Sequence, residues 1–352
     1  MQIEFYNREK EMEEMMRILN SRPDLITFIY GPINSGKTEL IQHLIDQLSD
    51  DFVVFYINLR ERMIRDYNDF IEALFEIEER RGKKKIVVRE LIAEVTKFAG
   101  IPISKDLLNV FFKEDRPKDA FRYIVDVVKD IKSSGRMSVL IVDELQKIGD
   151  VKVDDYLIYE LFNLFIRLTK ELHSCHVFAI TSDSLFIERV YAEAMLQGRC
   201  RYLLVDDFDF NTTKGFLKRY GFSEEEIDLT WNYFGGKPVY LVEAIKNKHR
   251  LKEFCEEMLR IRIGQLEEIV FRLERDNKAQ FKDVVEILNE FKNRDSVRYR
   301  FITDAISFLV KNNVIFADPT MKILKPQSKL DLLAVRRVLE EMEYETDPLH
   351  TL

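Results

Sequence analysis

Residues 31–38 combine two glycines, a lysine and a threonine at the spacing of a phosphate-binding loop. They read G-P-I-N-S-G-K-T and fit G-x-x-x-x-G-K-[ST]. Gly31 and Gly36 allow backbone angles and a close approach that a side chain would forbid. Lys37 would reach the β- and γ-phosphates, and Thr38 would bind Mg²⁺. The predicted phosphate cradle is Gly31, Pro32, Ile33, Asn34, Ser35, Gly36, Lys37, Thr38 and Glu39.

An acidic pair that follows an apolar run supplies a second part of this chemistry. Val139-Leu140-Ile141-Val142 ends in Asp143-Glu144, the pattern of a Walker B strand. Asp143 would hold hydrated Mg²⁺, and Glu144 would polarise a water for in-line attack on the γ-phosphate. The alternative is that both acids only begin a helix, whose dipole favours negative charge there. A kinase has no need of a water-activating glutamate, so the pair favours hydrolysis.

Two further positions are weaker candidates for catalytic roles. Thr181 or Ser182, after an apolar run, could bond the γ-phosphate or the lytic water as a sensor-1 residue, or the segment could cap a helix over 184–194. Arg199 could stabilise transition-state charge in its own or a neighbouring subunit. The alternative for that segment is a helix C-cap at Gly198 with Arg199 and Arg201 solvated.

Parallel strands alternating with helices are the elements that must position these residues. Strand-like apolar runs occupy 25–30, 53–59, 137–142, 176–181 and 201–205, with helical patterns between them. This alternation predicts an α/β fold with a parallel sheet covered on both faces. The mainly helical stretch 66–134 contains a basic cluster from Arg80 to Lys85, which we expect to be a solvated loop.

The pattern changes near residue 206 to helices alone. We expect short helices over 211–247, longer ones near 251–275, 278–292, 300–312 and 329–343, and a hairpin at 314–317 and 322–325. Three of these longer helices and the hairpin predict a winged helix. The predicted domains are a nucleotide-binding core over 1–205, a helical lid over 206–248 and a winged-helix domain over 249–352.

Composition excludes several classes of protein. The 352 residues are 46% hydrophobic, which provides for a sizeable core, and the net charge is −8, so the chain is not a nucleic-acid-coating cation. Three scattered cysteines have no metal-ligand or disulfide spacing, which fits a reducing cytoplasm. The charged amino terminus is not a signal peptide. No apolar run has the length of a transmembrane span, so we expect a cytoplasmic protein.

These motifs together resemble the archaeal ATPase family, a STAND-type branch of the AAA+-like P-loop ATPases related to replication initiators. The resemblance also rests on Phe5-x-x-Arg8-Glu9-x-Glu11 and on Gly235-Gly236-Lys237-Pro238-x-x-Leu241, and it covers nearly the whole chain. It implies a sheet in the order 5-1-4-3-2, a helical lid and a winged helix. It also implies that Arg8 lies near the base or phosphates and that Pro238 packs by the nucleotide. Arginines often follow the first P-loop glycine in this family, whereas Pro32 follows it here.

The resulting hypothesis is a slow, Mg²⁺-dependent ATPase that acts as a switch, with ATP and ADP as its nucleotides. Nucleotide state would control the packing of the lid and the winged helix. We also expect a protein partner and nucleotide-dependent oligomers. Residues 246–345 carry 20 Lys and Arg against 18 Asp and Glu, so DNA is the less favoured partner. The alternatives are an initiator-like or transposition-helper ATPase that binds DNA, and a non-catalytic nucleotide-gated scaffold.

Overall fold

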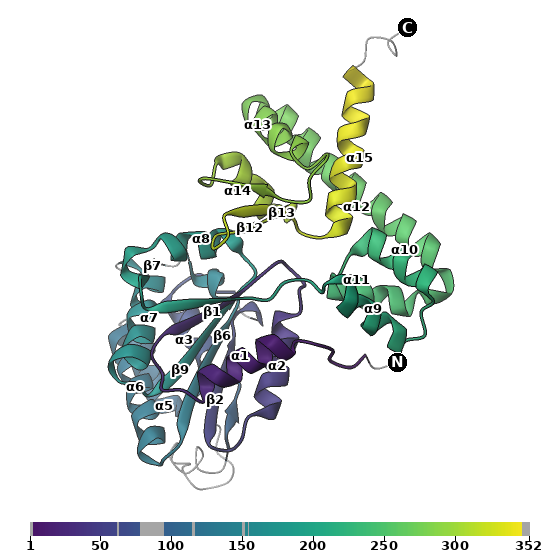
Figure 1. The fold of residues 1–352 in the computed structure, drawn as a ribbon. Helices are drawn as coiled ribbons and strands as arrows, with labels where there is room; N and C mark the ends of the chain where they lie inside the picture. The colour runs from purple at the N-terminus through teal and green to yellow at the C-terminus, as the bar shows by residue number, and fades with distance from the viewer. Residues whose placement is uncertain are drawn as a thin grey trace.

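The computed structural model describes residues 3–61, 63–77, 95–114, 117–149, 152–153 and 155–346. Figure 1 shows three parts: an α/β sheet domain, a small bundle of helices, and a carboxyl-terminal module of helices with a small sheet. The basic cluster from Arg80 to Lys85 lies outside the described residues.

A parallel sheet forms the centre of the first part. Its order is β10-β1-β9-β6-β2-β4, and every adjacent pair is parallel. The five predicted strands therefore have the order that the resemblance implied, and the two-residue strand β4 extends the edge beside β2. The strands are β1 (Ile26–Tyr30), β2 (Phe52–Asn58), β4 (Lys97–Phe98), β6 (Met137–Asp143), β9 (Cys175–Thr181) and β10 (Cys200–Leu204).

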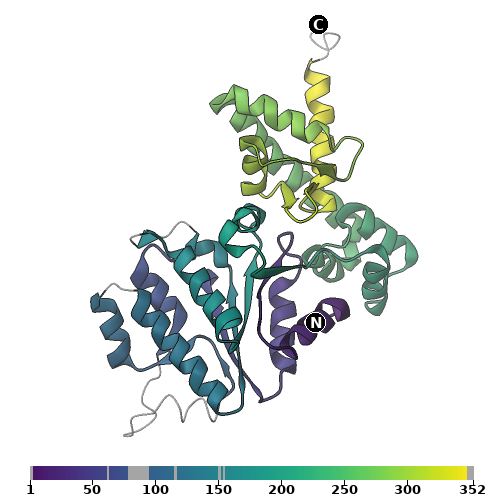
Figure 2. The same cartoon turned by 60° about the vertical axis from the view of Figure 1, so that its left-hand side comes forward.

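Helices cover both faces of the sheet, as Figures 1 and 2 show. Leu40, Leu44 and Met15 pack with Val139 and Phe178 on one face. The other face carries a larger core with many aromatic rings. Because both faces are covered, β1 and β9 are buried along their whole length. The helices of this domain are α1 (Glu9–Leu19), α2 (Lys37–Gln47), α3 (Tyr67–Leu74), α5 (Lys105–Glu114), α6 (Pro117–Ser133), α7 (Leu157–Ile166) and α8 (Ser184–Ala192).

Shorter elements lie between these strands and helices. Two small sheets form, one from β3 (Phe75–Ile77) with β5 (Ile101–Ile103) and one from β7 (Lys152–Val153) with β8 (Asp155–Tyr156). Two 3₁₀ turns directly follow strands, η1 (Leu59–Glu61) after β2 and η2 (Leu145–Ile148) near the end of β6.

The second part is the lid, a bundle of α9 (Phe210–Arg219), α10 (Glu224–Phe234) and α11 (Pro238–Lys246). Each helix begins at a recognisable signal: Asp209 caps α9, Ser223 and Glu226 form a capping box on α10, and Pro238 is the first residue of α11. The apolar faces of the three helices bury one shared core.

The carboxyl-terminal module has a core of its own. It contains the predicted helices and hairpin, with a short strand β11 added in the sheet order β11-β13-β12. The winged-helix assignment and the domain boundaries stay predictions. The elements are α12 (Leu251–Asp276), α13 (Lys278–Asn289), β11 (Val297–Arg298), α14 (Asp304–Lys311), β12 (Ile315–Asp318), β13 (Ile323–Pro326) and α15 (Lys329–Thr346).

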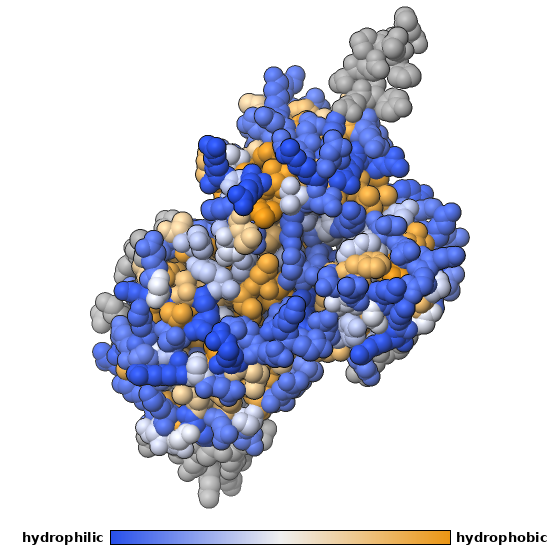
Figure 3. Space-filling view, in the orientation of Figure 1, coloured by the Kyte–Doolittle hydropathy of each residue, from blue (hydrophilic) through white to orange (hydrophobic). Residues whose placement is uncertain are grey.

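The β12–β13 hairpin joins this module to the sheet domain, beside the end of β1. The Tyr30 hydroxyl lies 3.1 Å from Asp318 Oδ1, and the ring of Phe316 stacks on that of Tyr30 with 6.4 Å between centroids. The Ala317 amide donates to Ser184 Oγ of α8 at 3.3 Å. In Figure 3, apolar side chains gather where the module meets the sheet domain, within a largely hydrophilic surface.

In the described part of the chain, no helix combines the length and apolar character needed to cross a bilayer.

Candidate nucleotide site

The loop at 31–38 connects β1 directly to α2, as predicted. A Cβ atom at Gly31 would lie 2.2 Å from the backbone oxygen of Val205, so only glycine fits there. Gly36 has a φ of 90°, and Asn34, a residue type that tolerates the left-handed region, has a φ of 57°. No side chain caps α2, whose first residue is Lys37, so the first amides of this helix are available to an anion.

Lys37 lies under this loop and is 5% exposed. Its Nζ donates to the carbonyl oxygens of Gly31 at 3.1 Å and Pro32 at 2.8 Å. Burial, followed by the nearby charge of Lys237, lowers the pKa of Lys37 to about 7. The ammonium thus binds loop carbonyls in the position from which it would reach phosphate oxygens.

Asp143 and Thr38 offer oxygen ligands that fit a magnesium ion. The Thr38 hydroxyl donates to Asp143 Oδ2 at 3.1 Å, and the Tyr56 hydroxyl donates to the same atom at 3.0 Å. Asp143 is 3% exposed, and among the described residues it has no ion pair within 4 Å. Burial raises the pKa of Asp143, which a bound cation would reverse. Hydroxyl and carboxylate oxygens are hard ligands, and Mg²⁺ typically takes only one or two from protein.

The carboxylate of Glu144 is bound by two side chains. It is 8% exposed, and its φ of 60° lies in the left-handed region at the end of β6. Arg60, from η1 beside β2, forms an ion pair with Glu144 Oε1. Gln146 Nε2 donates to Glu144 Oε2 at 2.7 Å. Each carboxylate oxygen therefore already accepts one hydrogen bond, and each keeps a second lone pair.

Thr181 ends β9 and is linked to Glu144 through Gln146. Its hydroxyl donates to Gln146 Oε1 at 2.7 Å, while the Gln146 amide nitrogen bonds Glu144. Ser182 is half-buried beside it, and Asp183 caps α8 by accepting from the amides of Leu185 and Phe186. The helix cap thus falls on Asp183, and Thr181 binds Gln146, while a sensor-1 role for Thr181 or Ser182 stays a prediction.

Arg8 reaches the outer side of the P-loop, and only 6% of it is exposed. Its Nη2 donates to the carbonyl oxygens of Ser35 and Asp206, both at 2.7 Å, and Nη1 pairs with Glu11 at 2.7 Å. The guanidinium also lies 4.7 Å from the ring centroid of Phe208. This arginine therefore ties the amino-terminal segment to the loop and to the segment that leads into the lid.

The lid contributes Lys237 to the site, whereas the sequence predicts a role only for its neighbour Pro238. Lys237 is 2% exposed, and its Nζ lies 2.9 Å from Asp207 Oδ1 and donates to the Ile33 oxygen at 3.0 Å. Pro238 is half-buried at the start of α11. A second ammonium group thus lies against the P-loop, close enough to Lys37 to lower its pKa.

Arg199 lies away from the site of its own chain. Its carbonyl oxygen accepts from the amide of Ile26, the first residue of β1, whereas the P-loop follows the last residue of that strand. Arg199 therefore lies at the amino ends of the parallel strands, whereas the P-loop lies at their carboxyl ends. Arg201 pairs with Asp24 at the same distant edge. A role for Arg199 toward a neighbouring subunit stays a prediction.

Four polar side chains that sequence reasoning missed also surround the site: Arg60, Gln146, Lys237 and Gln327. Lys237 lies within the Gly235-Gly236-Lys237-Pro238 motif, and Gln146 follows the Asp143-Glu144 pair by two residues. Arg60 follows the carboxyl end of β2, which meets the same sheet edge as the P-loop, so its position was a usable signal. Gln327 comes from the far end of the chain, and no local pattern indicates it.

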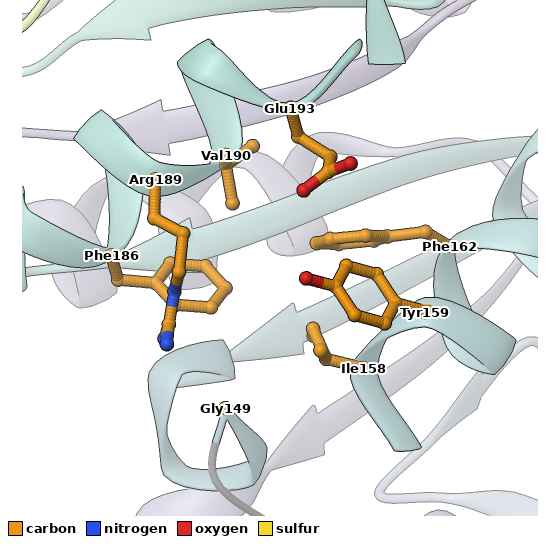
Figure 4. Close-up of a pocket in the computed structure, with 8 residues that line it drawn as sticks. All are labelled: Gly149, Ile158, Tyr159, Phe162, Phe186, Arg189, Val190 and Glu193. Atoms are coloured by element: carbon orange, nitrogen blue, oxygen red, sulfur yellow. The ribbon is translucent and has the colours of Figure 1, made fainter. Parts of the chain in front are cut away.

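Two cavities differ in their relation to this site. A polar cavity of about 240 Å³ lies between the P-loop, the lid and the carboxyl-terminal module, with Asn34, Lys237, Arg262 and Gln327 in its wall. The other, drawn in Figure 4, measures about 40 Å³ and lies between α7 and α8, with aromatic rings and Arg189 around it. The second cavity is far too small for a nucleotide and does not touch the P-loop.

Comparison with protein families gives two matches in succession along the chain. Residues 5–244 match the family described as an ATPase domain predominantly from Archaea. Residues 252–339 match the carboxyl-terminal domain of proteins described as similar to the uncharacterized ATP-binding protein MJ1010.

Individual relatives are similar over nearly the full chain. The uncharacterized ATP-binding protein MJ1659 of Methanocaldococcus jannaschii is 49% identical over 356 residues, which cover 97% of this chain and 99% of that protein. The uncharacterized ATP-binding protein PYRAB09480 of Pyrococcus abyssi is 50% identical, with coverages of 96% and 100%. The solved Walker-type ATPase PABY2304 of Pyrococcus abyssi has a TM-score of 0.64 at 16% identity and coverages of 94% and 96%, which indicates a shared fold.

Proposed function

The chain belongs to the archaeal ATPase family, and we propose that it is a slow, Mg²⁺-dependent ATPase that works as a switch. One observation carries this proposal: Lys37, the Thr38–Asp143 pair and Glu144 converge at one edge of the sheet, beside the loop. Phosphate binding, metal binding and water activation are thereby brought together. Membership of an ATPase family and the relatives described as ATP-binding proteins support nucleotide as the ligand.

The protein's own residues divide the work of hydrolysis. The loop amides and the amides at the start of α2 hold the phosphates, and Lys37 adds a positive charge to them. Thr38 and Asp143 would hold Mg²⁺, which supplies charge neutralisation at the phosphates. Glu144 accepts the proton of the attacking water, and Thr181, through Gln146, fixes the orientation of this carboxylate.

We propose that Glu144 leaves Arg60 when it acts and keeps the bond to Gln146 that orients it. Its Oε1 atom is paired with Arg60, and its Oε2 atom accepts from Gln146. Arg60 is 65% exposed, so this ion pair is weak and open to exchange. We propose that a slow turnover reflects this engaged state of Glu144.

The switch itself rests on the position of the carboxyl-terminal module. Its hairpin binds Tyr30 at the end of the P-loop strand, and Lys325 pairs with Asp206 next to the lid. A change in the loop or lid would therefore alter contacts of this module. We propose that nucleotide state sets this docking in a STAND-like manner, in the cytoplasm, and that the released module recruits a protein partner or a second copy of the chain.

The Glu144→Gln variant tests the catalytic part of the proposal. The amide keeps the size of the side chain but cannot take the proton, so phosphate release should fall by about 10²–10⁴-fold. Binding of Mg²⁺·ATP should stay nearly unchanged, because Lys37, Thr38 and Asp143 are intact. Glu171→Gln, on an exposed turn after α7, is the matched control and should hydrolyse ATP like wild type.

The outcome separates the proposal from its closest rival. Wild-type turnover in the Glu144→Gln protein would reduce Glu144 to a helix-start acid. Negligible turnover in wild type itself, with intact ATP binding, would favour the non-catalytic nucleotide-gated scaffold.

A DNA-binding initiator or transposition helper stays the other alternative. In the described conformation, β12 and α14 contact α8 of the sheet domain, and the hairpin turn is engaged by Tyr30. Part of the surface with which a winged helix usually reads DNA is therefore covered by the sheet domain. A salt-dependent DNA titration with and without ATP tests this alternative, since DNA binding confined to the ATP state would support it.

A further inference from the structure

Both backbone polar groups of Ile33 are bound by side chains from other parts of the molecule. The Ile33 amide donates to Gln327 Oε1 of the carboxyl-terminal module at 3.1 Å. The Ile33 carbonyl oxygen accepts from Lys237 Nζ of the lid at 3.0 Å. One residue of the P-loop, the third after the β1 strand, is thus held by two modules that follow it by 294 and 204 residues.

The orientation of Gln327 is fixed by its chemistry. Its Nε2 donates to the carbonyl oxygen of Ile315 in β12 at 3.1 Å, and its backbone amide donates to Val314 at 3.1 Å. The Ile315 carbonyl can only accept and the Ile33 N–H can only donate. The side chain of Gln327 therefore has one orientation that satisfies both, with Nε2 toward Ile315 and Oε1 toward Ile33. With 5% exposure, Gln327 couples the hairpin rigidly to the loop.

Lys237 is fixed equally well from the lid side. A Cβ atom at Gly236 would lie 1.7 Å from the Phe208 carbonyl oxygen, and the Phe208 amide donates to the Gly236 oxygen at 2.9 Å. This close approach holds Lys237 beside Asp207, whose carboxylate pairs with it at 2.9 Å. The lysine therefore moves only with the first turn of α11.

Cations hold most of the loop carbonyls. Lys37 binds the oxygens of Gly31 and Pro32, Lys237 binds that of Ile33, and Arg8 binds that of Ser35. A phosphate that draws Lys37 away from Gly31 and Pro32 leaves Ile33 as the adjoining fixed residue. Its amide lies in the Pro32–Ile33 peptide and its carbonyl in the Ile33–Asn34 peptide, so movement of this residue strains both bonds, one to each module.

We propose that Lys237 and Gln327 form a clamp on Ile33 through which the phosphates bound in the loop set the docking of the lid and the carboxyl-terminal module. This inference rests on the proposed nucleotide switch and names the residues that couple it. The coupling is reciprocal, so the docked modules also slow the release of nucleotide. The 240 Å³ cavity beside Asn34 gives the clamp side chains room to move when it opens.

The Gln327→Met variant tests the clamp, with Gln265→Met as its matched control. Gln265 lines the same cavity, but its side chain accepts from Arg262 and forms no hydrogen bond with the loop in the described part of the chain. Release of a fluorescent ADP analogue, followed by stopped-flow, should be about fivefold faster in Gln327→Met, the worth of one neutral hydrogen bond. The Gln265→Met protein should release it at the wild-type rate.

A double-mutant cycle then asks whether both side chains act through the same residue, Ile33. Lys237→Met and Gln327→Met should be non-additive in ADP release, because either change alone frees Ile33. Lys237→Met combined with Gln265→Met should be additive. Thermal unfolding of each variant reports its fold, and Lys237→Met alone serves as the test where Gln327→Met does not fold.

The outcomes distinguish the clamp from the function on which it rests. Equal ADP release by wild type, Gln327→Met and Lys237→Met overturns the clamp, while ATP hydrolysis that depends on Glu144 leaves the ATPase proposal standing. A wild-type protein that binds no nucleotide overturns both.

Discussion

The two ends of the central sheet carry different kinds of polar group. At the carboxyl ends of the strands, Lys37, Glu144 and Lys237 bind partners from three parts of the chain. At the amino ends, Arg201 pairs with Asp24 just before β1, and His176 Nε2 is buried with no hydrogen-bond partner among the described residues. Burial lowers the pKa of His176 to about 4, so this histidine stays neutral at pH 7.

This difference separates groups that can change partners from groups that only fit the fold. A buried ammonium that donates to loop carbonyls can exchange them for an anion, because phosphate oxygens are alternative acceptors. A neutral histidine under α1 has no alternative, and charging it only costs stability. Polar groups occur at both ends of the sheet, but those at the carboxyl ends of the strands have hydrogen-bond partners that a ligand can replace. This property distinguishes the functional end.

Lys37→Ala should give the largest effect at the carboxyl end. It removes the ammonium that faces the phosphates, so affinity for Mg²⁺·ATP should fall by about 10²-fold or more, the worth of two or more charge-assisted hydrogen bonds. Equilibrium binding of labelled ATP measures this loss, with exposed Lys246→Ala on α11 as control. Wild-type affinity in the Lys37→Ala protein would refute the phosphate-binding role of the loop.

Proton uptake on nucleotide binding should be the next effect. The folded pKa of Lys37 is about 7, so the free protein holds this group mostly neutral at pH 8, and bound phosphates favour its charged form. Asp143, Glu144 and Asp207 favour the charge, while Lys237 opposes it. ATP binding at pH 8 should therefore take up close to one proton, and affinity should fall about fivefold between pH 7 and pH 8.

Calorimetry in two buffers of different ionisation enthalpy measures this uptake. It should nearly vanish at pH 6, where Lys37 is already charged, and the Lys37→Met variant should lack it. An equal proton uptake by wild type and by Lys37→Met would assign the proton to another group.

Arg60→Ala should have a smaller effect and in the opposite direction. This change frees one oxygen of Glu144 from its ion pair, so steady-state phosphate release should rise by up to about fivefold, the upper worth of an exposed ion pair. Arg65→Ala removes a comparably exposed pair with Asp69 and should leave the rate unchanged. A fall in the rate of Arg60→Ala would make Arg60 a contributor to catalysis instead of a restraint on Glu144.

Arg199→Ala should have the smallest effect, because Arg199 lies at the amino ends of the strands. Turnover of the dilute protein should stay within about twofold of wild type. A loss that appears only at concentrations where the chain self-associates would support action on a neighbouring subunit. A large loss at every concentration would contradict the contrast between the two ends of the sheet.

Most of the sheet and the centre of the site were predictable from the sequence, since each depends on local patterns. Apolar runs followed by glycine or acidic residues gave the strands, the P-loop and the Asp143–Glu144 pair. The position of Arg199 was also decidable, because a residue before a parallel strand lies at the opposite edge from a residue after one. Lys237 and Gln327 were not, since their contacts with Ile33 depend on how separate modules dock.

The bond between Tyr30 and Asp318 has a consequence for how the chain is made. Its two residues are 288 positions apart, and Phe316 of the hairpin packs into the core beneath the sheet. Synthesis at about 5–20 residues per second separates them by about 15–60 seconds. In the last part of that interval, once β10 has been made, the nascent sheet domain lacks the ring of Phe316 but already has its complete P-loop. Nucleotide therefore has the opportunity to bind on the ribosome, before the last module arrives to close over the strand that carries the loop.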